Sequence, residues 1–369
     1  MGRWMRVAAC VSLGAGLACG VVGAQAGQGA GVEGGQGATY VDPVSRSELR
    51  ERAIVMLEEL ARSGSALTRA NAMEALQSVP SRAEDSIRAG LADENQGVRF
   101  AAAMTAGRAR MRGLVEAVRP LLRDPSPSVR AAAIFAMRVN GQNVDPTPLA
   151  SMLESRDAGL RGNVVMVLGE MGDASAAPML KGAANDPRAT GSLVEQKIVR
   201  LQIAEALVKL GDAEAVQTVR AALYPSSASE VETAVLAAQI LGNVKDSPSA
   251  PELIGRVREK LRPVEDPSAP DRADPKNPYL WPPELRLAAA RSLGQIGRRE
   301  GVYVADQYAR AEEPMVRALA ALVYGETGRE GDLSKLEAML GDGSEGVRLA
   351  AAAGVVRVVD RLAGSRGGR

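Results

Sequence analysis

One pattern of apolar positions recurs along most of the chain and has the spacing of an amphipathic helix. In most copies an aliphatic residue precedes an arginine, and apolar residues follow three and seven positions later, as in Val129, Arg130, Ala133 and Met137. These offsets fall on one face of a helix. The copies recur about every 31 residues, with two longer intervals. The pattern therefore predicts a series of helices that each bury one face.

Helix pairs are predicted by the turns that separate these copies. Glycines such as Gly169 and Gly172 end several copies, and Asp173 and Asp212 then stand where a short side chain can cap the next helix. Two such helices cannot bury their own apolar faces, so they must stack on further copies. We expect an all-α fold, an α-solenoid (superhelix) of about nine antiparallel helix pairs. Glu232 replaces the arginine in one copy; the arginines are Arg69, Arg99, Arg130, Arg161, Arg200, Arg286, Arg317 and Arg348.

The copies at residues 129–133, 285–297 and 347–352 resemble HEAT repeats. More narrowly, they are similar to the short bacterial HEAT-like repeats of the phycobilisome-lyase type, and the resemblance covers residues 45–363. It implies a scaffold that binds proteins. For a minority of such repeats it implies a bilin lyase or another enzyme.

The first 26 residues have the layout of a secretory signal peptide. Arg3 and Arg6 precede a short apolar run that ends before Ala24-Gln25-Ala26. The run is below the roughly 18–20 residues that a membrane span needs, so we expect cleavage and no span. A lipid anchor at Cys19 is the alternative. We expect residues 27–44 to be a flexible Gly-rich linker, residues 364–369 to be a disordered tail, and the protein to be exported to the periplasm or cell envelope.

Composition argues against several classes of function. The chain has no histidine, and its two cysteines, Cys10 and Cys19, lie in the leader. Metal sites built on thiolates or imidazoles and Ser-His-Asp or Cys-His nucleophiles are therefore excluded from the remainder. Basic and acidic residues number 45 and 44, and aromatic residues make up 3% of the chain, which disfavours nucleic acid as a partner. We expect no catalytic, cofactor or metal site.

The arginine row has two interpretations. An aspartate stands six residues before three of the arginines, at Asp93, Asp124 and Asp342. A turn aspartate that accepts hydrogen bonds from the arginine of its own or a neighbouring repeat would fix the turn and the stacking register. Alternatively, the row could bind an anionic partner. The spacing favours a structural ladder of arginines.

Two candidate partner surfaces remain. The position five residues after each arginine holds Met104, Phe135 and Met166 in successive repeats, with Phe100 nearby. These residues form either an apolar patch on the inner curve that binds a peptide or protein, or part of the buried core.

The second candidate is a proline-rich insertion at residues 263–283, which ends in Tyr279 and Trp281. These aromatic side chains either fold back over the stack, the favoured interpretation, or project as anchors for a partner.

The sequence as a whole predicts a non-enzymatic scaffold for protein–protein interaction in the bacterial cell envelope. The partner would be a protein, held by the inner surface of the solenoid or the proline-rich loop. The alternative is a lyase-type enzyme, or an enzyme accessory subunit, related to bilin lyases. The absence of histidine and of cysteine outside the leader disfavours this alternative.

Overall fold

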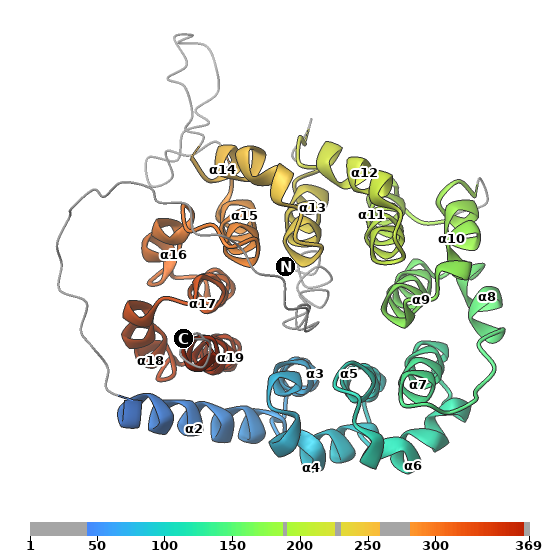
Figure 1. Cartoon of the computed structure of the whole chain (residues 1–369), viewed down its shortest axis with the longest axis horizontal. Helices are drawn as coiled ribbons and strands as arrows, with labels where there is room; N and C mark the ends of the chain where they lie inside the picture. Colours follow the sequence, from blue (N-terminus) through green and yellow to red (C-terminus); the bar gives the residue numbers. More distant parts are fainter. Residues whose placement is uncertain (1–42, 187–189, 226–229, 259–280, 365–369) are drawn as a thin grey trace, which may run out of the picture.

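A computed structural model describes residues 43–186, 190–225, 230–258 and 281–364, and helices are the regular elements of these ranges. They form an inner row around the centre of the molecule and an outer row that covers it (Figure 1). The inner row consists of α3 (Ala66–Ala75), α5 (Gln96–Arg108), α7 (Pro127–Val139), α9 (Ala158–Met171), α11 (Leu193–Lys209), α13 (Val231–Asn243), α15 (Pro283–Gln295), α17 (Pro314–Thr327) and α19 (Glu345–Gly364). The outer row consists of α2 (Pro43–Leu60), α4 (Pro80–Leu91), α6 (Val115–Val118), α8 (Pro148–Leu153), α10 (Ala177–Ala184), α12 (Val216–Ala221), α14 (Ala250–Arg258), α16 (Val302–Tyr308) and α18 (Leu333–Met339).

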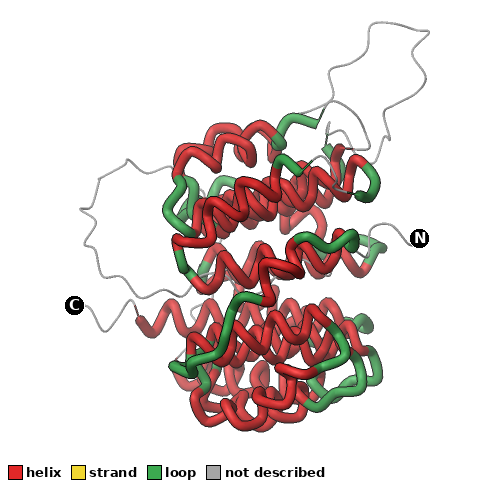
Figure 2. The backbone as a smooth tube through the Cα atoms, turned by 90° about the vertical axis from the view of Figure 1, so that its right-hand side faces the viewer, coloured by secondary structure: helices red, strands yellow, loops and turns green. Residues whose placement is uncertain are grey.

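The two rows alternate along the chain, so the inner helices all run in the same direction. In the described ranges, short loops join successive helices (Figure 2). The predicted all-α solenoid of stacked helix pairs is therefore confirmed.

Small residues set the spacing of the inner helices. A Cβ atom added at Gly107 would lie 2.4 Å from the ring of Phe135, and one added at Gly325 would lie 2.8 Å from the Cα atom of Gly354. Larger residues at these positions would force the helices apart. Ala136, whose Cα atom would lie 3.1 Å from the Cβ atom added at Gly107, is buried at the first of these contacts. The alanine-rich pattern is therefore a pattern of close helix approach, in which each helix supplies part of its neighbour's core.

The predicted turn chemistry is present at both ends of several helices. The Asp173 carboxylate accepts a hydrogen bond from the Ser175 N–H group at 3.0 Å, and Asp212 accepts one from the Glu214 N–H group at 3.2 Å. Gly172 and Gly328 take left-handed conformations, with φ of 70° and 64°, directly after α9 and α17. Glycine adopts this conformation without steric cost.

The two ends of the helical array meet, so the solenoid is a closed ring (Figure 1). Helix α2 packs along α19, and Leu57 and Ile54 of α2 are buried. Arg50 of α2 donates to Asp360 of α19 at 2.6 Å. Helix α2 thus takes the outer position beside α19, and one helix pair is assembled from opposite ends of the chain. We call the contact of α2 and α3 with α18 and α19 the seam.

Some predicted segments lie wholly or mostly outside the described residues. These are the signal peptide at 1–26 with Cys19, the linker at 27–44, the tail at 364–369 and most of the insertion at 263–283. Helix α2 begins at Pro43, inside the last two residues assigned to the linker. Helix α15 begins at Pro283, at the end of the insertion, where proline suits the first turn of a helix.

Candidate functional site

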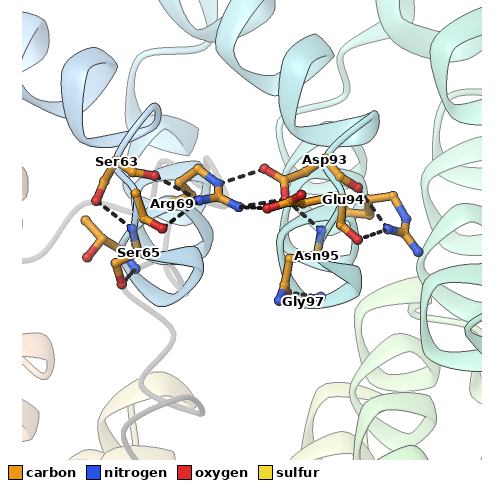
Figure 3. A network of polar contacts seen from close by, with 10 residues as sticks. Ser63, Ser65, Arg69, Asp93, Glu94, Asn95 and Gly97 are labelled. Atoms are coloured by element: carbon orange, nitrogen blue, oxygen red, sulfur yellow. Dashed lines mark hydrogen bonds and ion pairs between the residues drawn. The ribbon is translucent and has the colours of Figure 1, made fainter.

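Arginines at the N-terminal ends of the inner helices join successive repeats (Figure 3). Arg69 donates from Nε and Nη2 to both carboxylate oxygens of Asp93, at 2.7 and 2.9 Å, and from Nη1 to the Ser63 carbonyl at 2.8 Å. Arg99 contacts Asp124 in the same way, at 2.8 and 3.0 Å. Arg317 makes the same pair of bonds to Asp342, at 2.8 and 2.9 Å. Each arginine therefore reaches back to its own turn and forward to the next.

Aspartates of these rungs remain ionised. The hydrogen bond from Arg69 is the main reason that the pKa of Asp93 lies below its usual value, and Arg317 acts in the same way on Asp342. Burial alone would raise the pKa of Asp124, but hydrogen bonds from Arg99 and the Ser126 N–H group outweigh it and lower the pKa. We call these three arginine–aspartate pairs and their turns the ladder.

Within the described ranges, three of the predicted ladder arginines contact their own turn but do not pair with an aspartate of the next turn. Arg130, Arg161 and Arg348 each donate from Nη1 to carbonyls of their own turn, at 2.7, 2.7 and 2.8 Å. Nη2 of Arg161 donates to a backbone carbonyl, that of Thr190, at 3.0 Å. In the described part of the chain these three arginines have no carboxylate partner in the next turn.

Arg200 and Arg286 do not belong to the ladder, so the prediction was wrong at these two positions. Helix α11 begins at Leu193, one turn earlier than its repeat pattern implies, and Arg200 is exposed. Gln196 takes its place and donates to the Gly191 carbonyl at 3.0 Å. Arg286 is fully buried and donates to the Val257 carbonyl at 3.1 Å and to the Tyr308 hydroxyl at 2.8 Å.

The predicted apolar patch on the inner curve is not a surface. Met104 and Phe135 are 1% and 2% exposed, and Phe100 and Met166 are half-buried. Phe135 fills the space that Gly107 leaves on the neighbouring helix, so it belongs to the contact between α5 and α7. Neighbouring inner helices enclose the Met104 and Phe135 side chains. The buried interpretation therefore holds for Met104 and Phe135.

Trp281 packs against the core and is half-buried, as in the favoured interpretation of this residue. The guanidinium group of Arg256 lies 4.8 Å from the centre of the Trp281 ring and 4.8 Å from that of Tyr224. Tyr224 is 56% exposed. We call these three residues the aromatic cluster. Tyr279 lies outside the described residues.

Polar side chains near the C-terminal ends of the inner helices make contacts that the sequence did not suggest. Nη2 of Arg108 on α5 lies 3.4 Å from Oε1 of Glu170 on α9. This contact therefore spans the intervening helix α7. Lys209 of α11 contacts Glu170 and Glu205, both at 3.0 Å. Asn243 of α13 donates to Glu205 at 3.4 Å. A continuous chain of polar contacts therefore runs across four inner helices.

The chain of contacts continues around the ring towards the seam. Gln295 donates to the Asn243 side-chain oxygen at 3.3 Å. Arg291 lies 3.5 Å from Glu326, which also pairs with Arg357 of α19. We call the whole set the inner polar belt: Arg108, Glu170, Lys209, Glu205, Asn243, Gln295, Arg291, Glu326 and Arg357.

Charges in the belt compensate one another. Burial acts most strongly on Lys209 and would lower its pKa, but Glu205 and Glu170 outweigh this and raise it. Burial likewise would raise the pKa of Glu170, and the charges of Arg108 and Lys209 lower it instead. Both groups therefore stay charged. Burial lowers the pKa of Arg291, and the carboxylate of Glu326 opposes this effect.

A cavity of about 40 Å³ lies in the belt between α5, α9, α11 and α13. Arg108 lines it, and the Arg108 side chain is 6% exposed. Its Nη2 atom faces Glu170 and the Met166 sulfur at 3.5 Å, but its Nε and Nη1 atoms have no hydrogen-bond acceptor. A buried donor without an acceptor costs about 1–3 kcal/mol. Of the predicted apolar patch, Met166 lines this cavity.

The belt could have been found from the sequence at another position of the repeat. Charged or amide side chains stand nine residues after the repeat arginine at Arg108, Glu170, Lys209, Gln295, Glu326 and Arg357. In an ordinary soluble helix, polar residues in such a row indicate a solvent-exposed face. The closed ring instead brings this face to the interior. The sequence alone therefore did not distinguish this row from an ordinary solvent-exposed face, whereas it did identify the arginines at the helix starts.

Comparisons with known proteins agree with this architecture. A family model described as HEAT repeats matches residues 53–138, 115–192, 146–238 and 280–356. No curated protein matches the chain. In the residues that the structure covers, no three His, Cys, Asp or Glu side chains are grouped as metal ligands, and none of the helices has the length and apolar character of a membrane span.

Solved structures that match the chain have low sequence identity and low TM-scores. The complex of CpcE and CpcF of phycocyanin lyase from Nostoc sp. PCC7120 is 18% identical, with a TM-score of 0.35, and the match covers 75% of this chain and 94% of that one. Human deoxyhypusine hydroxylase in complex with glycerol is 16% identical, with a TM-score of 0.36, over 86% of this chain and 99% of that one. At these values neither similarity extends to an activity.

Proposed function

The chain belongs to the HEAT-repeat family, and we propose that it is a non-enzymatic scaffold that binds a partner protein along the inner wall of its ring. The inner polar belt is the observation that carries this proposal. It offers charged and amide groups from α5, α9, α11 and α13 beside a cavity, and Arg108 is left with two unused donors there. A receptor that leaves donors unsatisfied in its interior is suited to an acceptor from another molecule.

Rigidity of the ring supports binding without chemistry. Close helix contacts at Gly107 and Gly325 and the seam hold the belt residues in place before a partner arrives. Binding then costs little ordering of the receptor, which leaves more of the contact energy as affinity. The repeats thus serve as a frame, and the residues that differ between repeats provide the specific contacts.

The aromatic cluster is a second contact surface in this proposal. Tyrosine, tryptophan and arginine are the residue types that dominate the binding energy of protein interfaces. Tyr224 is exposed, and the guanidinium group of Arg256 lies within cation–π distance of both the Tyr224 and the Trp281 rings. The cluster lies beside the points where the chain leaves α14 and enters α15.

The cell envelope is the compartment that we propose for this scaffold. The support is the basic and apolar leader at residues 1–26, which precedes the helical array. Fractionation of cells that express the full chain tests this assignment. Recovery of the protein in the cytoplasm with residues 1–26 still attached would contradict it.

Photo-crosslinking from three positions tests the scaffold. A photoreactive residue replaces Met166 at the cavity, Tyr224 in the aromatic cluster, or Leu193, which is 76% exposed at the start of α11 and serves as the control. We expect one protein to be captured from Met166 and Tyr224 and not from Leu193. Identical products from all three positions would contradict the proposal, as would turnover of a small molecule by purified protein that captures nothing.

A further inference from the structure

We propose that the cavity between α5, α9, α11 and α13 is a binding site for a carboxylate group and that Arg108 recognises it. This inference rests on the proposed function, because it names the chemistry that the partner presents to the inner wall. The shared chemistry is a single carboxylate, carried either by an acidic side chain of a polypeptide or by a free small acid.

Size limits the group that the cavity admits. Its volume is about 40 Å³. A water molecule needs roughly 10–15 Å³ measured in this way, so the cavity accommodates about three waters or a group of three heavy atoms. A carboxylate has three heavy atoms, whereas phosphate and sulfate have five. The cavity therefore fits a carboxylate better than either of the larger anions.

Arg108, which lines the cavity, has donors that make no hydrogen bond. The Nε and Nη1 atoms of Arg108 donate to no group, and protein atoms shield both from solvent. The one carboxylate near Arg108, that of Glu170, lies 3.4 Å from Nη2, which is long for a charged hydrogen bond. A guanidinium group is planar and pairs with a carboxylate through two parallel bonds. Nε and Nη1 lie on different edges of the group, so a ligand carboxylate would bind through Nε together with Nη2, the edge that Arg69 uses in the ladder. A small turn of the Arg108 side chain would present this edge to the ligand, and Glu170 would keep its contact with Lys209.

Arg108 is the more weakly paired of the two cations that line the cavity. Lys209 contacts Glu170 and Glu205 at 3.0 Å, and Asn243 donates a further hydrogen bond to Glu205. The two belt carboxylates are therefore already held by other donors. Arg108 has one carboxylate contact, at 3.4 Å, with a Glu170 side chain that it shares with Lys209, so a ligand carboxylate would compete with one weak contact. The remaining lining includes amide side chains that can donate further bonds: Gln202, Gln239 and Asn243.

Titration of the full chain with sodium formate, at constant ionic strength, tests the site. In ¹⁵N-labelled protein, one arginine Nε–H signal should shift and saturate with a dissociation constant of about 1 mM or weaker, the range that a three-atom ligand can reach. The same signal should be absent from the Arg108→Lys variant. The Arg200→Lys variant is the matched control, because Arg200 is exposed and lies outside the belt. Its formate response should equal that of the wild type.

Further arms of the experiment identify the source of the carboxylate. A capped peptide with one glutamate is compared with the same peptide carrying glutamine, and sodium sulfate is the size control. Saturation of the same Nε–H signal by the glutamate peptide assigns the site to a polypeptide. Saturation by formate and acetate alone assigns the site to a free small acid. That result would support the carboxylate site but would remove the inner polar belt as an argument for the proposed scaffold function.

Three results would overturn the inference. In the first, no arginine Nε–H signal of the wild-type protein saturates with formate. In the second, the signal that saturates persists in the Arg108→Lys variant. A stronger response to sulfate than to formate would also contradict it, because the cavity would then accept a larger anion. The wild-type titration gives an answer even if the Arg108 variant does not fold.

Discussion

At the N-terminal ends of the inner helices, the same contact recurs between neighbouring repeats, whereas at their C-terminal ends each contact is different. The ladder joins Arg69 to Asp93 and Arg99 to Asp124, always from one repeat to the next. The belt joins Arg108 to Glu170 across a whole repeat. The ladder satisfies its donors and acceptors, and the belt leaves two donors of Arg108 unused. The comparison separates residues that hold the ring together from residues that are available to bind.

Acid is expected to have the largest effect, because it acts on all rungs of the ladder at once. The pKa values of Asp93, Asp124 and Asp342 are lowered in the folded protein. Their stabilising contribution is therefore complete above the unfolded pKa of about 3.9 and is lost as the pH falls through the folded values. Thermal melts followed by circular dichroism should show a steep fall in Tm below about pH 4.

A variant with asparagine at the three aspartates is the control for this prediction. It should be less stable than the wild type at pH 7 and should show a shallower dependence on pH below about pH 4. Belt carboxylates such as Glu170 are present in both proteins, so they cancel in the comparison. Equal slopes for the two proteins would mean that the ladder does not carry the acid sensitivity.

A single rung allows the ladder to be tested at one position. Asp124 is 7% exposed and accepts hydrogen bonds from Arg99 and from the Ser126 N–H group. Asp124→Ala should lower the free energy of unfolding by about 3 kcal/mol, because it leaves a poorly solvated guanidinium without its partner. Urea denaturation measures the change. The matched control is Asp145→Ala, at an exposed turn aspartate that accepts from Thr147, and it should cost less than about 1 kcal/mol.

At the seam, the turns at the N-terminal ends of the inner helices are joined by a glutamate and two hydroxyl groups and not by an arginine–aspartate pair. Glu345 at the start of α19 accepts hydrogen bonds from Ser63 at 2.7 Å and Thr68 at 2.9 Å, near the other end of the array. Glu345→Ala should cost about 1–2 kcal/mol and should accelerate hydrogen exchange in α2 and α19 more than in α7. Glu337→Ala removes the exposed contact to Arg52 and should cost less than about 1 kcal/mol. Uniform acceleration throughout the ring would show that Glu345 does not hold the seam.

Repetition explains which parts of the molecule could be predicted. The helix pairs and the complete rungs follow from a pattern that compares each repeat with the next. Closure of the ring and the belt join residues far apart in sequence, such as Arg50 with Asp360, which no local pattern relates. Exposure of Phe135 could not be judged either, since it depends on the space beside Gly107 on another helix.

The misplaced start of α11 had a visible signal. Ser192 and Glu195 form a capping box, in which each side chain bonds the backbone of the other, and this motif marks a helix start. The repeat period placed Arg200 near the start of the helix, and the capping box places the start one turn earlier. Where the two signals differ, the local capping chemistry decides the helix boundary, because it satisfies backbone groups that stacking cannot reach.

The smallest change in stability is expected for a substitution at Arg108. This substitution is the sharpest test of the difference between the ladder and the inner polar belt. Arg108→Met removes two donors that have no acceptor and keeps a side chain of similar length in the cavity wall. Glu170 retains its contact with Lys209. The free energy of unfolding should therefore change by less than about 1 kcal/mol, since replacing a poorly satisfied buried charge with a packed apolar group is often neutral. Arg99→Met, the same substitution in the ladder, should cost about 2–3 kcal/mol because Asp124 loses its partner. Urea denaturation of the two variants side by side measures the difference, and equal losses would mean that Arg108 stabilises the ring as a ladder arginine does.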